Sequence, residues 1–137
     1  MNKFLQTPTA IKLAGLAMLI HAASATAAPM YPAEAGNYLN GGVGLDARQA
    51  MHAERAHYNL RLRFAQARTG EYLSGVGVII EPLGKKGAFM RYEDAGPLLY
   101  VRLHPGSYRI RAVFEGRRQL RTVVVGKSAT ERVIYWP

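Results

Sequence analysis

The sequence contains no cysteine, and this absence removes several kinds of protein from consideration. No disulfide can form, and no thiolate is available as a nucleophile or a metal ligand. No lipid-modified cysteine can stand at a new N-terminus. Small exported domains commonly depend on disulfides, so an exported chain without them must be held together by its apolar core. This favours an efficient, well-layered sheet structure.

Acidic residues are scarce, and long hydrophobic runs are absent. The 137 residues include 9 Asp and Glu against 18 Lys and Arg, a net charge of +9. The most apolar stretch, from Leu13 to Ala23, is too short to cross a bilayer, which requires about 20 residues. Nothing later in the chain resembles a membrane-spanning helix, so we expect no transmembrane segment in the processed protein.

The first 27 residues have the organisation of a secretory signal peptide. Lys3 and Lys12 are their only charges, an apolar stretch follows, and small residues come next. An Ala-x-Ala signal ends at Ala27, and we place the cleavage after it because a cut one residue later would put Pro29 just beyond the site. Removing two of the 18 cations leaves 16 against 9 acidic residues, a net charge of +7. The sequence therefore predicts a periplasmic or secreted protein.

Residues 28–45 mix proline, glycine, asparagine and alanine without a period, which predicts a flexible leader. Residues 46–57 then predict a short helix, with its regular part over about 47–56. Asp46 is the expected N-cap, and Gln49 stands at the capping-box spacing. The apolar face is weak, so we expect the helix to lie lightly on a sheet; its members are Ala47, Ala50, Met51 and Ala53.

From Tyr58 onward the apolar period becomes two, which is typical of half-buried antiparallel strands. In "YNLRLRFA" and "YRIRAVF" the apolar side chains alternate with arginines. Seven such short segments, separated by turns rich in glycine or proline, fill residues 58–137. They predict an all-β fold, a seven-stranded antiparallel Greek-key β-sandwich preceded by the short helix.

Several motifs of this region are similar to those of a known family. They are "TGEYLSGVGVII", the "DAGP" turn, "LHPGSYRIRA" and "EGRRQLRTVVV". Over residues 58–137 the chain resembles the carboxypeptidase regulatory-like domain, a transthyretin-like (prealbumin-like) sandwich. The whole chain also resembles small exported bacterial proteins with a "GGVGLD" leader. This resemblance implies a fold and a compartment, and it implies no substrate.

One hairpin motif of that family reads leucine, proline, proline, glycine, any residue, tyrosine. Leu103, Pro105, Gly106 and Tyr108 match it, and His104 replaces the first proline. Independently of the resemblance, Gly106 permits a tight turn, and the Tyr108 hydroxyl is placed to bond the turn backbone as in a tyrosine corner. We therefore interpret Pro105, Gly106 and Tyr108 as structural turn residues.

The sequence offers little for catalysis, metals or cofactors. Hydrolases on related sandwiches end in a tyrosine, arginine, glycine, serine signature, whereas this chain ends in "VIYWP". His52 and His57 are five residues apart, a poor spacing for shared metal ligation on a helix, and His104 belongs to a turn. We expect no catalytic, metal-binding or cofactor-binding residues.

The remaining feature is a set of outward-facing arginines. If the two arginine-alternating strands belong to one sheet, Arg61, Arg63, Arg109 and Arg111 share a face that attracts phosphate or carboxylate. The interpretation favoured by the sequence alone is an ordinary solvated face, because surface charge mostly reflects solubility and non-specific attraction, and an anion-binding face is the alternative. Export and the lack of interleaved aromatics argue against specific nucleic-acid binding. Other arginines would stand at the margins of this face, namely Arg102, Arg117, Arg118 and Arg121.

These features together predict an exported, non-catalytic binding or structural module of the cell envelope. Its arginine-rich face would meet anionic envelope components or an acidic protein partner. The alternative is a hydrolase of the transthyretin-like type whose site the motifs do not reveal.

Overall fold

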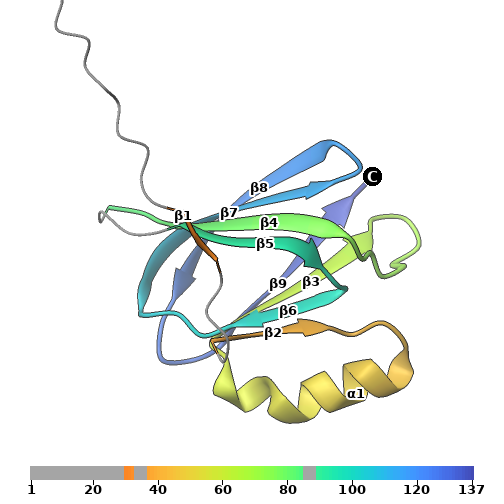
Figure 1. The fold of residues 1–137 in the computed structure, drawn as a ribbon, viewed down its shortest axis with the longest axis horizontal. Coiled ribbons are helices and arrows are strands. Elements are labelled where there is room, and N and C mark those ends of the chain that lie inside the picture. The colour runs from red at the N-terminus through yellow and green to blue at the C-terminus, as the bar shows by residue number, and fades with distance from the viewer. Residues whose placement is uncertain (1–29, 33–36, 85–88) are drawn as a thin grey trace, which may run out of the picture.

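Two β-sheets pack face to face in the computed structural model, which describes residues 30–32, 37–84 and 89–137 (Figure 1). The predicted signal peptide and residues 28–29 and 33–36 of the predicted leader lie outside the described residues. The described elements, in chain order, are β1 (Met30–Pro32), β2 (Tyr38–Gly41), α1 (Leu45–Glu54) with a 3₁₀ turn (Arg55–His57), β3 (Leu60–Gln66), β4 (Val76–Pro82), β5 (Phe89–Ala95), β6 (Leu98–Val101), β7 (Gly106–Phe114), β8 (Arg117–Val125) and β9 (Thr130–Trp136).

The strands form a five-stranded sheet in the order β1-β5-β4-β7-β8 and a four-stranded sheet in the order β2-β6-β3-β9. The two-sheet β architecture is confirmed, but the predicted count of seven strands is wrong. The described sandwich has nine strands, because β1 and β2 from the predicted leader join β3–β9. Most neighbours are antiparallel. The prediction of purely antiparallel pairing is wrong at two places, because β1–β5 and β3–β9 are parallel.

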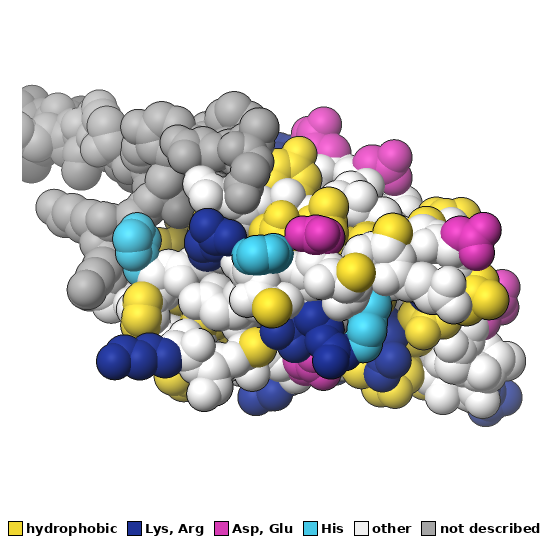
Figure 2. All heavy atoms as spheres, turned by 90° about the horizontal axis from the view of Figure 1, so that it is seen from below, with side chains coloured by type: hydrophobic (Ala, Val, Ile, Leu, Met, Phe, Trp, Pro, Cys, Tyr) yellow, Lys and Arg dark blue, Asp and Glu magenta, His cyan; other side chains and the backbone are white. Residues whose placement is uncertain are grey.

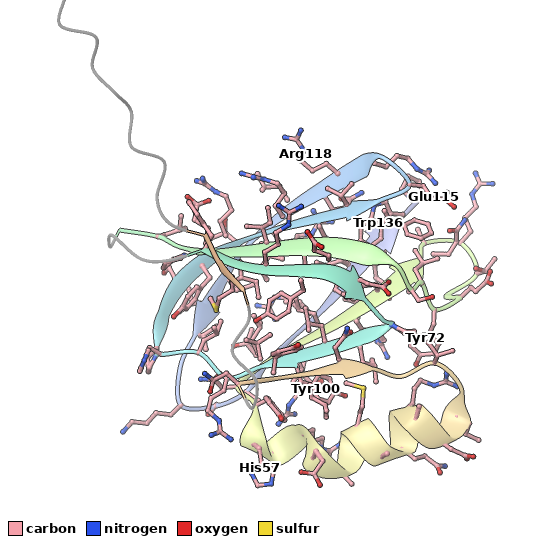
Figure 3. The ribbon with its side chains drawn as sticks, viewed as in Figure 1. His57, Tyr72, Tyr100, Glu115, Arg118 and Trp136 are labelled. Atoms are coloured by element: carbon pink, nitrogen blue, oxygen red, sulfur yellow. The ribbon has the colours of Figure 1, made fainter. Side chains whose placement is uncertain are left out.

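The core lies between the sheets and is built by the predicted alternation. Leu60, Leu62 and Phe64 of β3 are fully buried, and the alternating apolar residues of β4 and β7 are buried opposite them. Trp136 of β9 is also fully buried, with its ring 6.2 Å from the Phe64 ring, and Figure 3 shows it between the two layers. Tyr58, predicted to join this face, instead packs near Tyr100 on the outer side of the smaller sheet.

The predicted flexible leader is wrong for Tyr38–Gly41, which form β2 at the edge of the smaller sheet. Asn40 joins β2 to the β5–β6 connection: the Gly96 amide donates to its Oδ1 (2.7 Å), and its Nδ2 donates to the Asp94 carbonyl (2.9 Å). A Cβ atom at position 96 would lie 2.6 Å from the Gly41 carbonyl oxygen, so only glycine permits this approach. Four residues are too few to show a strand period.

The predicted helix is present, but its N-cap differs from the prediction. Gly44 is the N-cap, no side chain caps the first turn, and Asp46 lies inside that turn. There its carboxylate still favours the positive end of the helix dipole. The weak apolar face is confirmed, since Met51 is the only buried residue of α1.

The turn around Pro105 and Gly106 carries the chain from one sheet to the other. The prediction that this turn closes a hairpin is wrong, because β6 and β7 belong to different sheets. The predicted tyrosine corner is confirmed: the Tyr108 hydroxyl donates to the His104 carbonyl at 2.7 Å. The bond spans four residues and fixes the path of the crossing.

We expect Tyr108→Phe to reduce the free energy of unfolding by about 1 kcal/mol, since it removes one hydrogen bond to the backbone. Urea unfolding of wild type and variant measures this difference. Tyr135→Phe is the matched control, because that side chain is 44% exposed, and its effect should be close to zero. Equal losses in the two variants would show that the hydroxyl bond has no special role.

Stability should fall in alkaline solution because three tyrosines are held neutral in the folded state. Burial raises the pKa of Tyr92, Tyr100 and Tyr108 above the ordinary value of 10.0. Their contribution to stability is complete below about pH 10 and is lost as the pH rises through the raised folded values. Urea unfolding at pH 9, 10 and 11 should show a decreasing free energy of unfolding. Tyr92→Phe should make that decrease shallower, and an unchanged slope would contradict the assignment.

Candidate functional site

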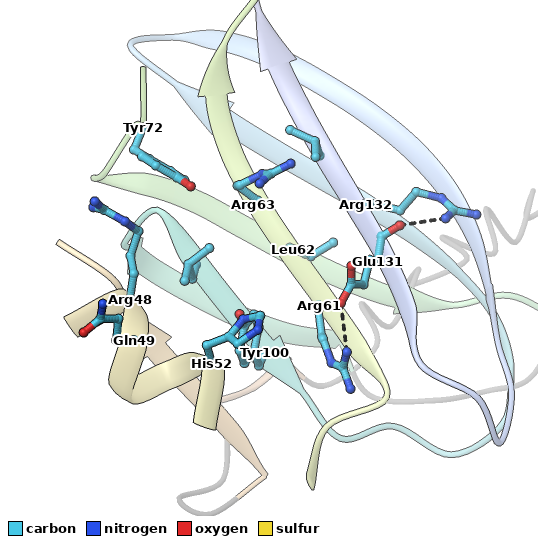
Figure 4. Close-up of a pocket in the computed structure, with 12 residues that line it drawn as sticks. Arg48, Gln49, His52, Arg61, Leu62, Arg63, Tyr72, Tyr100, Glu131 and Arg132 are labelled. Atoms are coloured by element: carbon cyan, nitrogen blue, oxygen red, sulfur yellow. Dashed lines mark hydrogen bonds and ion pairs between the residues drawn. The ribbon is translucent and has the colours of Figure 1, made fainter. Parts of the chain in front are cut away.

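A pocket of about 430 Å³ lies between α1 and the outer face of the four-stranded sheet (Figure 4). α1 covers the β2 and β6 side of this face, where Met51 contacts Leu98 and Tyr100, and the β3 and β9 side stays open. Figure 2 looks onto this side of the molecule and shows basic and histidine side chains among hydrophobic ones. The residues lining the pocket are Arg48, Gln49, His52, Arg61, Leu62, Arg63, Tyr72, Leu98, Tyr100, Glu131, Arg132 and Val133.

The floor of the pocket is set by the alternation of β3. Its inner residues fill the core, so Arg61 and Arg63 must project from the outer face. Tyr100 and Glu131 flank Arg61 on the neighbouring strands β6 and β9. Arg63 has the apolar neighbours Leu98 and Val133.

The two floor arginines differ in their partners. Nη1 of Arg61 lies 2.8 Å from Oε1 of Glu131, and its Nε donates to the Arg55 carbonyl at 3.0 Å. The Arg61 side chain is 16% exposed, so its guanidinium is fixed beside the sheet. Arg63 is exposed and has no hydrogen bond or ion pair with any residue that the structure describes. Arg63 is therefore the floor cation that can accept an external anion.

Arg48 and Tyr72 form the end of the pocket opposite Glu131. The Arg48 guanidinium carbon lies 4.6 Å from the centre of the Tyr72 ring, and its Nη1 donates to the Gly42 carbonyl at 3.3 Å. Tyr72 is held by a bridge to Ala65, next to the end of β3. In Figure 4, Arg48 on the helix and Arg63 on β3 flank Tyr72. An aromatic surface and two guanidinium groups thus meet in one place.

Tyr100 supplies a neutral hydroxyl to the pocket. Burial raises its pKa, Glu131 raises it further, and Arg61, Arg55 and Arg63 act in the opposite direction. The phenol therefore stays protonated at neutral pH. Counted by charge, the lining holds four arginines and one glutamate, a formal balance of +3 with histidine neutral.

The prediction that four arginines share one face is wrong. Arg61 and Arg63 lie on β3, whereas Arg109 and Arg111 lie on β7 of the other sheet. Both pairs point away from the core, so they face opposite sides of the sandwich. Nη1 of Arg109 lies 3.7 Å from Oε2 of Glu81.

The other predicted residues are also dispersed. Arg102 donates from Nε to the His57 carbonyl at 2.8 Å, and Arg117, Arg118 and Arg121 lie on β8. His52 and His57 are exposed on the helical segment, and within the described ranges no three metal-ligating side chains gather. Pro105, Gly106 and Tyr108 lie at the sheet crossing, away from the pocket.

Sequence reasoning missed Arg48, Tyr72 and Glu131 as pocket residues. They come from α1, the loop before β4 and the last strand, and no sequence spacing connects them. The sequence could not place Glu131 beside Arg61, because β9 and β3 are distant segments that meet only through parallel pairing.

Comparison with protein-family models and with curated proteins finds no match for the chain. Among the helices of residues 30–32, 37–84 and 89–137, none has the length and apolar character to cross a membrane.

We expect Glu131→Gln to strengthen binding of inorganic phosphate in the pocket about two- to fivefold. The Glu131 carboxylate is exposed, an ion pair at the surface contributes about 0.2–1 kcal/mol, and its removal frees the Arg61 guanidinium for the anion. NMR titration at low salt measures the change. Glu115→Gln, at the tip of the β7–β8 hairpin, is the control and should leave the affinity unchanged (Figure 3). Weaker binding in Glu131→Gln would mean that the ion pair orders the site.

Proposed function

We propose that the protein is an exported, non-catalytic binding module whose pocket beside α1 holds small anionic molecules that carry an apolar or aromatic body. The observation that carries this proposal is the joint placement of Arg48, Arg63 and Tyr72 around one cavity. Neither arginine is in an ion pair with a described residue. Guanidinium groups suit phosphate and carboxylate oxygens, and a tyrosine ring suits a flat apolar body.

The size and charge of the pocket support a small ligand. A volume of about 430 Å³ falls within the usual range of ligand cavities, roughly 300–1,000 Å³. Its balance of +3 favours an anion, and Tyr100 adds a hydroxyl that both donates and accepts. Phosphorylated or carboxylated components of the cell envelope have this chemistry.

We further propose that the sandwich is a Greek key of the transthyretin-like type. β4, β5 and β6 follow one another around the sandwich, and β7 returns to lie beside β4. This chain order matches the Greek-key pattern, distributed over two sheets. The Tyr108 bond at the sheet crossing supports the resemblance of the "LHPGSY" motif.

Export to the periplasm or the medium is also part of the proposal. It rests on residues 1–27, whose sequence has the charges, apolar stretch and small residues of a signal peptide.

The test is an NMR titration of the purified protein with phenyl phosphate, inorganic phosphate and phenol. Phenyl phosphate should bind more tightly than either fragment and should shift the amides of Arg63, Tyr72 and Tyr100. Arg63→Gln should weaken its binding about tenfold, because a charge-assisted hydrogen bond contributes about 1.5–3 kcal/mol. Raising the salt concentration should weaken it further.

Arg111→Gln is the matched control, since it removes one arginine from the opposite outer face. The variant should bind phenyl phosphate as the wild type does. Equal losses of affinity in both variants would show that binding depends on the net charge of the protein and not on the pocket. Release of phenol during the titration would contradict the non-catalytic role and favour a hydrolase.

A further inference from the structure

Within the described residues, no backbone group pairs with the central part of the outer edge of β8. β8 is the last strand of its sheet, and among the described strands it pairs only with β7. The two strands join through Glu115 and Gly116, whose φ values of 48° and 73° fit a two-residue type I′ turn. Starting from the closing pair of such a hairpin, residues alternate between bonding the partner strand and facing away from it.

That alternation directs the backbone groups of Arg118, Leu120 and Thr122 away from β7. Val124, the next residue in this series, confirms the direction, because the Thr130 hydroxyl donates to its carbonyl from the open side (3.0 Å). No hydrogen bond from another described segment reaches the amides of Arg118, Leu120 or Thr122. A row of unpaired edge groups is a template for one more strand.

Neither end of this row is available to another strand, and in its middle one carbonyl accepts a hydrogen bond from a side chain. At one end of the row the Val124 carbonyl is occupied by the Thr130 hydroxyl. At the other end the row stops at Arg118, because Arg117 forms the closing pair of the hairpin and its carbonyl also accepts a bond from Nε1 of Trp136 (2.9 Å). The Leu120 carbonyl accepts a bond from Nη1 of Arg121 at 2.8 Å. Because the Arg121 guanidinium is exposed, it can leave the Leu120 carbonyl and bind a carboxylate instead. The available length therefore runs from Arg118 to Thr122.

The side chains along this edge indicate the charge of the missing strand. Leu120 is 51% exposed, and Figure 3 shows Arg118 pointing out from β8. β8 carries Arg117, Arg118 and Arg121 and no acidic residue, and Arg117 has a single carboxylate 4.0 Å away. A second copy of β8 would bring the same three positive charges, which disfavours self-pairing. An added strand with acidic side chains neutralises these three positive charges while its backbone pairs with the edge.

We propose that the β8 edge from Arg118 to Thr122 binds an acidic, extended segment of a partner protein by β-augmentation. The added strand runs antiparallel to β8. It places an apolar residue opposite Leu120 and carboxylates opposite Arg118 and Arg121. Backbone hydrogen bonds give the affinity, and the two carboxylates give the specificity. This surface is separate from the pocket beside α1 and does not depend on it.

The probe is a capped heptapeptide with the residues threonine, threonine, glutamate, valine, threonine, glutamate and threonine in that order. Aligned antiparallel, it sets valine opposite Leu120 and the glutamates opposite Arg118 and Arg121. Calorimetry and NMR with the purified protein should show saturable binding and shifts of the Leu120 and Thr122 amides. A peptide with lysine for glutamate, and one N-methylated at the valine, should each bind at least tenfold more weakly.

Two variants at one position separate the backbone contribution from the side-chain contribution. Leu120→Pro removes an amide that faces away from β7, so the β7–β8 ladder keeps its bonds. It should weaken peptide binding at least tenfold, whereas Leu120→Ala should stay within about threefold. Thermal unfolding checks that Leu120→Pro folds. If it does not fold, the N-methylated peptide tests the same hydrogen bond on the wild type.

Charge variants complete the test. Arg118→Gln combined with Arg121→Gln should weaken binding at least tenfold, and Arg63→Gln, in the pocket, should leave it unchanged. Equal binding of the N-methylated peptide, or shifts confined to Tyr72 and Tyr100, would overturn the proposal. A concentration-dependent dimer of the free protein that Leu120→Pro abolishes would assign the edge to a second copy and would also overturn it.

Discussion

The register of β3 is the constraint on which the rest of the structure depends. β3 is the only described strand of the smaller sheet that pairs on one side with an antiparallel neighbour and on the other with a parallel one. Its inner residues complete the core, and its outer arginines form the floor of the pocket. A shift of one residue would exchange these two faces, burying guanidinium groups and exposing Leu62 and Phe64. Core packing and pocket chemistry are therefore specified by the same alternation.

The sequence was informative wherever structure follows from local period. Alternation in β3, β4 and β7 predicted which side chains face the core, and the weak face of α1 predicted its light packing. Pairing between distant segments was not predictable in this way. β2 is too short to show a period, and its position depends on the approach of Gly41 to Gly96, 55 residues apart by number.

The candidate site shows the same limit. Arg61 and Arg63 were identified because they alternate with core residues, but their grouping with Arg109 and Arg111 assumed that β3 and β7 share a sheet. Alternation fixes whether a side chain points inward or outward and leaves open which of two outer faces it reaches. The actual neighbours of Arg63 are supplied by tertiary contacts, which no spacing in the chain encodes.

α1 buries a single side chain, that of Met51, and this has a consequence for the energetics of the fold. A helix that buries one side chain can separate from the sheet at a free-energy cost well below that of global unfolding, so it forms its own unit of local stability. The amides of α1 then exchange with solvent faster than those of β3. A molecule that bridged Arg48 on the helix and Arg63 on the sheet would join the two units, and its binding would slow exchange in α1 before it changed the sandwich.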